Sequence, residues 1–457
     1  MSDTALAFLL RTIDEVAEQG QQIPLWIALP APHCDPLRLW PANGDAYYWR
    51  DGDGLSALGW GEGHCVEMLS HQELRRVTQT ARPWYQQLKA ICHPQCSDAL
   101  PQWFWGMSFH AQHHRLHPWH AFPAFHAAMP QWTYVQRKTD SLLALCIAAK
   151  QNKVALKQQA QCLWERLETL AQQSKVTPRC DAELSSPWVS LADDDASARA
   201  WQKDVDAVIG QINEGALHKL VLARCHQTRI DATRSIPEIL STLQARFAQC
   251  AIFAFRLGTQ CLLGATPEVL MRKDGEDIYS EALAGSAVPE EAHKLVARDK
   301  EQGEHRFVVE AIAQALQERC SALTVATTPQ LRHLPNIVHL HTPLHGVLRD
   351  PSTSLIELCL DLHPTPAVGG LPRQRAIDWI EAQESLSRGW YGAPLGCMDA
   401  QGDGTAAVVL RAALLEHRDA WVYAGAGIVA QSDAAQEYNE TLIKMQAMLQ
   451  ALKPLQQ

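Results

Sequence analysis

A glycine-rich segment and the helix that follows it, near the C-terminus, constrain the fold of this chain most. Residues 423–429 read Tyr-Ala-Gly-Ala-Gly-Ile-Val, which predicts a strand whose backbone a ligand can approach closely. In the next helix, Glu437, Glu440 and Lys444 are three, four and seven residues apart and therefore share one face. Two carboxylates and an ammonium beside a bare backbone indicate a site for a divalent cation and an anionic ligand. The alternative is a solvated helix face with an ordinary Glu–Lys pair.

The composition is that of a soluble globular enzyme, and it limits the partners that such a site can have. The chain has 457 residues, enough for two or three domains or one large α/β unit, and a net charge of −10. This acidic balance argues against nucleic acid or a membrane surface as a partner. An anionic substrate would therefore need lysine, arginine or a metal inside the site to reverse the local field.

The sequence also indicates a cytoplasmic location. Its 13 cysteines include no CxxC pair and, with the lack of a signal peptide, they indicate reduced thiols. The first 20 residues predict an amphipathic helix rather than a targeting segment. No apolar run reaches the roughly 18 residues that a membrane span needs.

The order of the predicted elements favours the α+β class, with large mixed or antiparallel β-sheets flanked by helices. Strands mostly come in adjacent runs separated by helices, which is not the pattern of a doubly wound parallel sheet. Long strands are predicted over 261–272 and 406–415, and a long helix over 290–320. We expect an N-terminal variable α+β part, residues 1–195, and a catalytic part, residues 196–457, that form one integrated fold.

Two ionisable residues in apolar strand patterns are candidates for acid–base chemistry. Glu268 follows an apolar run, and burial would raise its pKa and make it a general acid. The alternative for Glu268 is a structural carboxylate that caps backbone N–H groups. Lys219 begins an apolar strand, where desolvation would lower its pKa and make it a general base. Its alternative is a strand-end lysine that extends its ammonium into solvent.

Carboxylates on two helices suggest a metal site. Glu301 and Glu304 begin one face of the helix predicted over 290–320. Glu304 there and Glu440 on the last helix can converge on one Mg²⁺, an ion that keeps several waters and accepts a ligand carboxylate.

Six histidines between residues 110 and 126 look like metal ligands at first sight. They are His110, His113, His114, His117, His120 and His126. Pro118 and Pro123 interrupt the cluster, so no rigid helix holds two imidazoles four residues apart, and no cysteine or carboxylate nearby completes a tetrahedral set. A surface loop is therefore predicted here rather than a metal site.

Taken together, these segments resemble the chorismate-utilising enzymes, a family that includes anthranilate, aminodeoxychorismate, isochorismate and salicylate synthases. The resemblance covers about residues 200–450, and the N-terminal part matches weakly. The matching motifs, in family order, are residues 218–224, 264–268, 281–286, 300–305, 338–340, 363–370, 409–411, 423–429 and 437–444. The resemblance implies the fold of anthranilate synthase component I, with no fused amidotransferase domain and a monomeric state.

Three positions indicate which reaction the resemblance implies. Members that use ammonia commonly carry Gln where this chain has Lys219, whereas Lys goes with water as the nucleophile. Aminodeoxychorismate synthases carry a nucleophilic Lys in the segment of Ala284, so no covalent route is expected. Salicylate synthases usually read Phe-Pro-Ser-Ile-Thr-Ala-Ser-Gly where residues 363–370 of this chain read His-Pro-Thr-Pro-Ala-Val-Gly-Gly.

The resemblance therefore implies an isochorismate synthase that acts reversibly on chorismate with Mg²⁺. Lys219 would take a proton from the water that adds at C2 of the ring, and Glu268 would protonate the departing C4 hydroxyl. Glu304 and Glu440 would bind Mg²⁺, with Glu301 and Glu437 behind them or acting through water. The implied substrate contacts are Ala284, Gly285, Ser286, His339, Thr365, Tyr391, Arg411, Gly425, Ala426, Gly427 and Lys444.

Three alternatives stay open from the sequence. A salicylate synthase would follow the same first step with pyruvate elimination. A catalytically silent chorismate-binding subunit would need a partner, although the full set of acid, base and metal residues argues against it. The product of the implied reaction feeds menaquinone or catecholate siderophores, and we expect menaquinone because the divergent N-terminal part does not suggest a siderophore enzyme.

Overall fold

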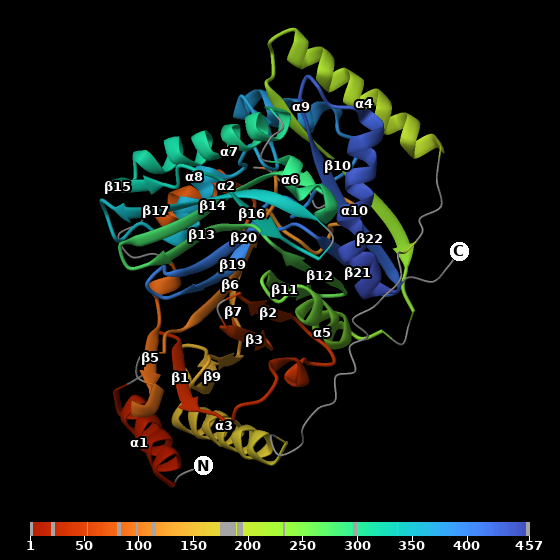
Figure 1. The fold of residues 1–457 in the computed structure, drawn as a ribbon. Coiled ribbons are helices and arrows are strands. Elements are labelled where there is room, and N and C mark those ends of the chain that lie inside the picture. Colours follow the sequence, from red (N-terminus) through yellow and green to blue (C-terminus); the bar gives the residue numbers. More distant parts are fainter. Residues whose placement is uncertain are drawn as a thin grey trace.

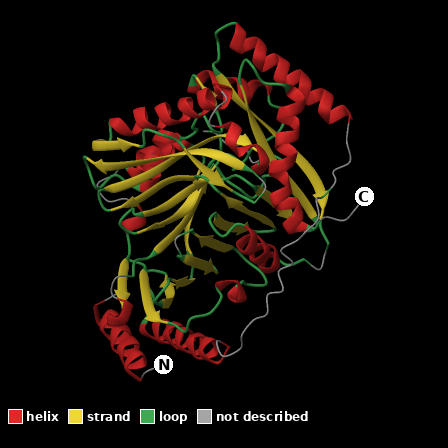
Figure 2. Ribbon diagram, in the orientation of Figure 1, coloured by secondary structure: helices red, strands yellow, loops and turns green. Residues whose placement is uncertain are grey.

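Two large β-sheets form the centre of the molecule, with helices around them (Figures 1 and 2). The computed structural model describes residues 3–19, 23–52, 54–79, 84–96, 99–110, 116–173, 189, 195–231, 234–295, 299–335 and 337–453. The expected α+β class is confirmed, because nearly all strand pairs are antiparallel and the helices lie outside the sheets.

The first sheet contains strands from both ends of the chain. Its order is β18 (Gly370–Leu371), β10 (Lys219–Arg229), β22 (Asp419–Ile428), β21 (Ala412–Glu416), β12 (Gln260–Thr266), β11 (Ala251–Leu257), β2 (Ala46–Arg50), β3 (Ser56–Trp60), β8 (Trp132–Gln136), β9 (Ser141–Ile147), β1 (Leu25–Pro30) and β5 (Lys89–Cys92). Only the β1–β5 pair in this sheet is parallel.

The second sheet is antiparallel throughout. Its order is β15 (Cys320–Val325), β17 (Val338–Leu348), β14 (Asp277–Ala287), β13 (Val269–Asp274), β20 (Gly404–Val408), β19 (Pro394–Asp399), β6 (Gln102–Met107), β7 (Phe125–Met129) and β4 (His64–Met68), and β16 (Gln330–His333) also pairs with β17. Strands from both expected parts, 1–195 and 196–457, therefore hydrogen bond within the same two sheets.

Helices flank the sheets, and local sequence explains where several of them begin. They are α1 (Asp3–Gln19), α2 (His71–Thr78), α3 (Lys153–Gln173), α4 (Asp195–Asn213), α5 (Ile236–Arg246), α6 (Ala292–Leu295), α7 (Asp299–Gln317), α8 (Leu355–Leu362), α9 (Arg373–Gln383) and α10 (Ala434–Leu452). Ser354 and Glu357 form a capping box at the start of α8, and Asp433 accepts the Gln436 N–H at the start of α10. None of the helices that the structure describes is long and apolar enough to span a membrane.

Aromatic side chains join the two sheets. Tyr47 of the first sheet stacks on Phe104 of the second, with ring centroids 5.6 Å apart, and Phe255 meets Tyr47 edge-on. Trp49 and Trp105 are fully buried in the same apolar cluster. Such pairs bury large areas and favour offset or edge-on geometry, so they hold the sheets face to face.

The predictions of single long strands over 261–272 and 406–415 are both wrong for the same reason. Each run is divided into two strands where the chain passes from one sheet to the other. The apolar run 261–272 forms β12 in the first sheet and β13 in the second, with Pro267 and Glu268 between them. The run 406–415 forms β20 and β21, with Arg411 in the break at φ +48°. Proline cannot donate to a ladder, which favours the first break. Each run is largely buried both before and after the break, so its apolar pattern does not show that the chain changes sheet there.

The two crossovers lie side by side. The Ala265 N–H donates to the Arg411 carbonyl at 3.2 Å, and the Val408 N–H donates to the Glu268 carbonyl at 3.1 Å. The Thr266 hydroxyl also donates to the Val408 carbonyl, at 2.6 Å. These bonds place Glu268 and Arg411 at one junction between the sheets.

The helix predicted over 290–320 is interrupted. The structure has a short 3₁₀ turn at Pro289–Glu291, then α6 and α7, and residues 296–298 lie outside its described part. Figure 1 shows α7 along the second sheet and α10 beside β22 of the first. The carboxylates that the sequence predicts on two helices therefore approach the junction from different sheets.

Candidate active site

One cavity lies at the junction between the sheets and collects most of the predicted site residues. Its lining includes twelve of them, namely Glu268, Ala284, Gly285, Ser286, Glu304, His339, Tyr391, Arg411, Gly425, Gly427, Glu440 and Lys444. They come from two sheet crossovers, the strands β14, β17 and β22, the helices α7 and α10, and the segment between α9 and β19 that holds Tyr391. Residues that are far apart in sequence thus share one enclosed space.

Glu268 is a buried acid at the first crossover. The residue is 2% exposed, and burial raises the pKa of its carboxyl to about 8, with Glu281 adding to the rise and Lys219 opposing it. The pKa of Glu268 is therefore set by burial and by nearby charges. Among the residues that the structure describes, no hydrogen bond from a capped backbone N–H contributes to it, as the structural alternative would require. At neutral pH the carboxyl is mainly protonated and can donate a proton into the cavity.

Lys219 is buried rather than extended into solvent. Its side chain is 1% exposed, and its Nζ lies 2.8 Å from Oε1 of Glu304. The alternative of a solvent-directed strand-end lysine is therefore wrong. Lys219 lies behind the cavity wall and reaches the cavity through Glu304, which lines it.

Gly427 makes room for this ion pair. A Cβ atom at that position would lie 2.3 Å from Oε1 of Glu304 and 2.9 Å from Cε of Lys219. Real Cβ atoms essentially never show the first of these distances. The second glycine of the Gly-rich strand thus leaves the space in which the Glu304 carboxylate lies. The approach of a ligand to this backbone stays a prediction.

The helix α10 presents a second carboxylate–lysine pair to the cavity. Nζ of Lys444 lies 2.6 Å from Oε1 of Glu440 and donates to the Gly425 carbonyl at 2.9 Å. Both side chains line the cavity, and Glu437 on the same helix is buried. The alternative of a solvated helix face is therefore wrong.

Arg411 is a buried cation at the second crossover. Its Nη2 donates to Nε2 of His339 at 3.2 Å. Burial and the nearby cations Arg411 and Lys444 lower the pKa of His339 well below its ordinary value, so its ring is neutral. Within the described part of the chain, Nη1 of Arg411 is buried and has no hydrogen-bond partner. A cation with an unused donor in a cavity is suited to an anionic ligand.

The neutral ring of His339 is fixed on its other side. Nδ1 lies 3.1 Å from the Ser286 hydroxyl and 3.3 Å from the Gly285 carbonyl. Because Nε2 accepts from Arg411, Nδ1 carries the proton and donates to these oxygens. The bulged segment 284–286 of β14 and Arg411 are thus linked through one imidazole.

The aromatic wall of the cavity includes a residue that the sequence reasoning missed. Tyr391, which was predicted, stacks on Tyr423, with ring centroids 5.3 Å apart. Tyr423 also lines the cavity, and its hydroxyl accepts from Nε1 of Trp119 at 2.9 Å. Tyr423 begins the glycine-rich segment 423–429, and this position was the signal in the sequence that could have identified it as a site residue. The contact also shows that the N-terminal part supports the cavity wall.

Four other predicted residues lie behind the cavity rather than in its lining. Glu301 packs behind Gly285, and Glu437 is buried within α10. Ala426 alternates with the glycines on either side of it and points into the core. Thr365 is buried in a turn, where its hydroxyl accepts the Ala367 N–H at 3.3 Å. Thr365 therefore positions the cavity-lining Ala367 instead of lining the cavity itself.

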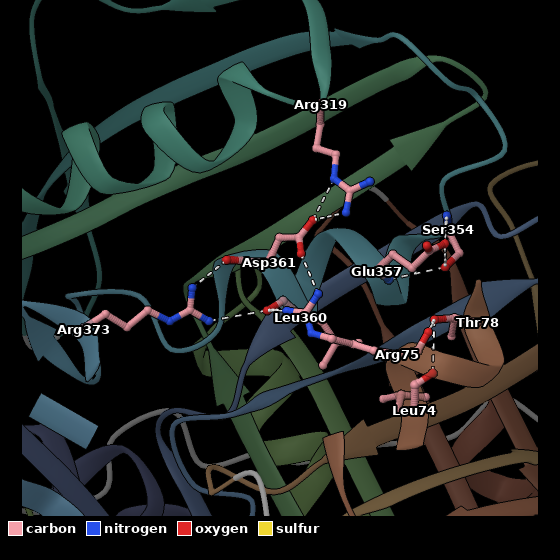
Figure 3. A network of polar contacts seen from close by, with 9 residues as sticks. All are labelled: Leu74, Arg75, Thr78, Arg319, Ser354, Glu357, Leu360, Asp361 and Arg373. Atoms are coloured by element: carbon pink, nitrogen blue, oxygen red, sulfur yellow. Dashed lines mark hydrogen bonds and ion pairs between the residues drawn. The ribbon is translucent and has the colours of Figure 1, made fainter. Parts of the chain in front are cut away.

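An arginine network anchors the segment that carries Thr365 (Figure 3). Asp361, in the last turn of α8, accepts from Arg75 at 2.8 Å and from Arg319 at 2.6 and 2.8 Å. Arg373 donates to the Asp361 carbonyl at 2.7 Å. These cations satisfy the carboxylate and the C-terminal end of the helix, where positive charge is favoured. The network therefore fixes where residues 363–370 leave α8.

The histidine cluster is only partly the predicted surface loop. His120 lies 3.1 Å from Glu416 and is exposed, and His117 packs on Trp421. His126, by contrast, is buried on strand β7, so the loop prediction is wrong for this residue. His113 and His114 lie outside the described residues.

Known proteins resemble this chain over nearly its whole length. It is 34% identical to the salicylate biosynthesis isochorismate synthase of Pseudomonas aeruginosa, over 92% of this chain and 88% of that protein. It is 31% identical to the isochorismate synthase MenF of Bacillus subtilis, over 97% of this chain and 96% of that protein.

A solved structure and a family model agree with these relatives. The structure of MenF from Escherichia coli, titled as the menaquinone-specific isochorismate synthase, matches with a TM-score of 0.74 and 25% identity, over 98% of this chain and 99% of that one. The model of the family described as chorismate binding enzyme matches residues 11–453. That span includes both sheet crossovers and every residue of the cavity. Because the match covers nearly the whole chain, the chain belongs to the chorismate binding enzyme family.

Proposed function

We propose that this protein is an isochorismate synthase that interconverts chorismate and isochorismate. The observation that carries the proposal is the pairing of a buried lysine, Lys219, with a protonated buried acid, Glu268, at one cavity that also holds the free donor of Arg411. An enzyme that adds water at one carbon and releases a hydroxyl at another needs both a base and an acid. The names of the relatives with matching length support the same activity.

In the proposed reaction, Lys219 and Glu268 act at C2 and C4, the two ends of the conjugated ring segment along which the double bonds shift. Lys219 acts as the base and takes a proton from water, whose oxygen forms a bond to C2 of the ring. The ring double bonds shift, and the C4–O bond breaks. Glu268 donates its proton to the departing hydroxyl, which leaves as water. Solvent then returns the proton from Lys219 to Glu268, so the net reaction is an isomerisation.

The remaining lining residues suit a dicarboxylate substrate. Arg411 and Lys444 supply positive charge inside a protein of net charge −10, as an anionic substrate requires. The backbone of Gly425 and Gly427 is open to the cavity, and the stacked rings of Tyr391 and Tyr423 form an apolar wall. We propose that these groups bind the two carboxylates and the ring.

We propose further that the reaction requires Mg²⁺. The donor set fits this ion, because Glu304 and Glu440 offer hard carboxylate oxygens to one cavity. Glu301 and Glu437 lie behind these ligands and would orient them or act through water. When bound, Mg²⁺ would supply positive charge against the ring carboxylate of the substrate.

Product analysis after incubation with chorismate and Mg²⁺ tests the proposal. Chromatography should show isochorismate in equilibrium with chorismate. Salicylate, detected by its fluorescence, would instead indicate the alternative in which pyruvate is eliminated. If neither product forms, the chain is not an isochorismate synthase, and retained chorismate binding would then support the silent-subunit alternative.

We propose menaquinone synthesis as the pathway and a cytoplasmic monomer as the working form. The MenF proteins of two organisms match nearly the whole chain, which supports menaquinone synthesis. A relative named for salicylate biosynthesis also matches nearly the whole chain. The cysteines in the described part of the chain are free thiols, which supports a reducing compartment. Menaquinone and siderophore content of a deletion strain, and sedimentation of the purified protein, test these points.

A further inference from the structure

Three possible metal ligands meet at the edge of the second sheet, far along the chain from the proposed Mg²⁺ ligands. Cys65 and Glu67 are two residues apart on β4, so their side chains lie on the same face. His126 on β7 pairs directly with Glu67 across the two strands. The ligand atoms of all three residues lie within 4.8 Å of one another. His126 of the histidine cluster thus lies beside a cysteine and a carboxylate that belong to a different strand.

Two distances from Nδ1 of His126 are close to those between ligands of one tetrahedral ion. Sγ of Cys65 lies 3.6 Å from Nδ1 of His126, and Oε1 of Glu67 lies 3.3 Å from the same nitrogen. Tetrahedral Zn²⁺ with ordinary bond lengths separates a sulfur from a nitrogen ligand by about 3.6 Å, and a nitrogen from an oxygen ligand by about 3.3 Å. Sγ of Cys65 also lies 4.0 Å from Nε2 of His126, so the Cys65 side chain has to turn toward the Nδ1 side of the ring to share an ion with it. The pairing of β4 with β7 can stay as it is.

The other ring nitrogen of His126 is held from the opposite sheet. The Tyr47 hydroxyl lies 2.9 Å from Nε2, and the two rings are stacked with centroids 5.7 Å apart. A histidine that ligates through one nitrogen usually has the other fixed by such a partner. His126 is 2% exposed, whereas Cys65 and Glu67 are exposed. The group is thus rigid on its inner side and open to solvent on its outer side.

Charge and ligand type favour a borderline-soft cation. Glu67 and Asp45, the charged groups that act on the Cys65 thiol, are both negative. A set of thiolate, imidazole and carboxylate ligands suits Zn²⁺, whereas Mg²⁺ and Ca²⁺ prefer oxygen ligands alone.

We propose that Cys65, Glu67 and His126 bind Zn²⁺, with water as the fourth ligand on the solvent side. The ion would connect β4, the edge strand of the second sheet, to β7. In the bound form Nδ1 ligates the ion, Nε2–H donates to the Tyr47 oxygen, and the Cys65 thiol loses its proton. None of the three ligands lines the cavity of the proposed active site, so this site does not depend on the proposed function.

Cobalt substitution tests the site directly. Full-length, reduced protein is freed of metal, saturated with Mg²⁺ to fill oxygen-ligand sites, and titrated with Co²⁺. One equivalent should produce the near-ultraviolet absorption of a cobalt–thiolate bond, and Zn²⁺ should displace it. The substitution C65S should abolish this band, and E67Q should weaken Co²⁺ binding at least tenfold. Both side chains are exposed, so these variants should fold and keep wild-type turnover of chorismate.

The matched control is C162S, which removes another exposed cysteine, on α3. It should leave the cobalt–thiolate band unchanged. Zn²⁺ should also slow alkylation of Cys65, measured by peptide mass spectrometry, without slowing that of Cys162. Absence of the band in the wild-type protein, or an equal band in C65S, would show that the three residues form only a hydrogen-bonded group, and would overturn the proposal.

Discussion

Nζ of Lys219 lies 2.8 Å from Oε1 of Glu304, and the two side chains form a buried pair at the wall of the cavity. Under the proposed function, the first residue is the base and the second a ligand of Mg²⁺. The pair therefore couples the two roles, because an ion that binds the Glu304 carboxylate competes with the lysine for the same oxygen.

Replacing the base should stop the reaction. The substitution Lys219→Ala removes the proton acceptor and should lower kcat by about 10²–10⁴-fold, the usual contribution of a general base. It also leaves Glu304 without its buried cation, so circular dichroism and thermal unfolding should accompany the assay. Lys219→Gln, which can still hydrogen bond to Glu304, controls for this loss. Near-wild-type turnover by both folded variants would remove Lys219 as the base.

Replacing the acid should block loss of the C4 hydroxyl. The substitution Glu268→Gln keeps the shape of the side chain but removes the proton, and should lower kcat by about 10²–10⁴-fold with little change in KM. The rate of equilibration between chorismate and isochorismate, started from either compound, is the measurement. An unchanged rate in both directions would contradict the acid assignment.

The raised pKa of Glu268 predicts a pH dependence of both rate and stability. The carboxyl is protonated in the folded protein up to about pH 8, whereas its ordinary pKa is 4.5. The forward rate should therefore fall as the pH rises through about 8. Because the folded state holds this proton more tightly, its contribution to stability is fully present below pH 4.5 and is lost as the pH rises through about 8. Chemical denaturation across this range should show a flatter pH profile for Glu268→Gln than for the wild-type protein.

The absence of a side chain at Gly427 should be as important for turnover as the neighbouring Lys219 and Glu304 side chains. In Gly427→Ala, the methyl group would lie 2.3 Å from Oε1 of Glu304 and must displace that carboxylate. Turnover should fall at least tenfold, and the Mg²⁺ concentration for half-maximal rate should rise. The control is Gly210→Ala on α4, where an added Cβ meets nothing within 4 Å. That variant should keep full activity and gain up to about 1 kcal/mol of stability, since alanine favours a helix over glycine. Equal activity of the two variants would show that the Glu304 position does not matter.

Metal removal should abolish turnover reversibly. Chelation with EDTA should stop the reaction, and added Mg²⁺ should restore it. In Glu440→Gln an amide replaces one of the two proposed ligands, so at least tenfold more Mg²⁺ should be needed for half-maximal rate. Glu310→Gln, an exposed change on α7, is the control and should behave as the wild-type protein. Full activity in EDTA, or an unchanged Mg²⁺ dependence in Glu440→Gln, would contradict the metal assignment.

The fold class and most members of the cavity could be predicted from the sequence, but by different routes. The alternation of strand runs and helices predicts α+β, whereas residues such as His339, Tyr391 and Arg411 were predicted only through the family resemblance. The glycines around residue 426 and the carboxylates of α10 also predicted a cation and anion site, because their meaning depends on neighbours within one helix turn or one strand.

The neighbours of these residues across the cavity depend on how distant segments pack together. The apolar runs around Glu268 and Arg411 look continuous, because a strand buried in one sheet and a strand buried in another have the same pattern. Likewise, His126 has no ligand partner near it in sequence, and strand pairing brings Cys65 and Glu67 to it. Periodicity reports whether a side chain is buried, but the register between distant strands decides which side chains meet, and register depends on contacts across the whole chain.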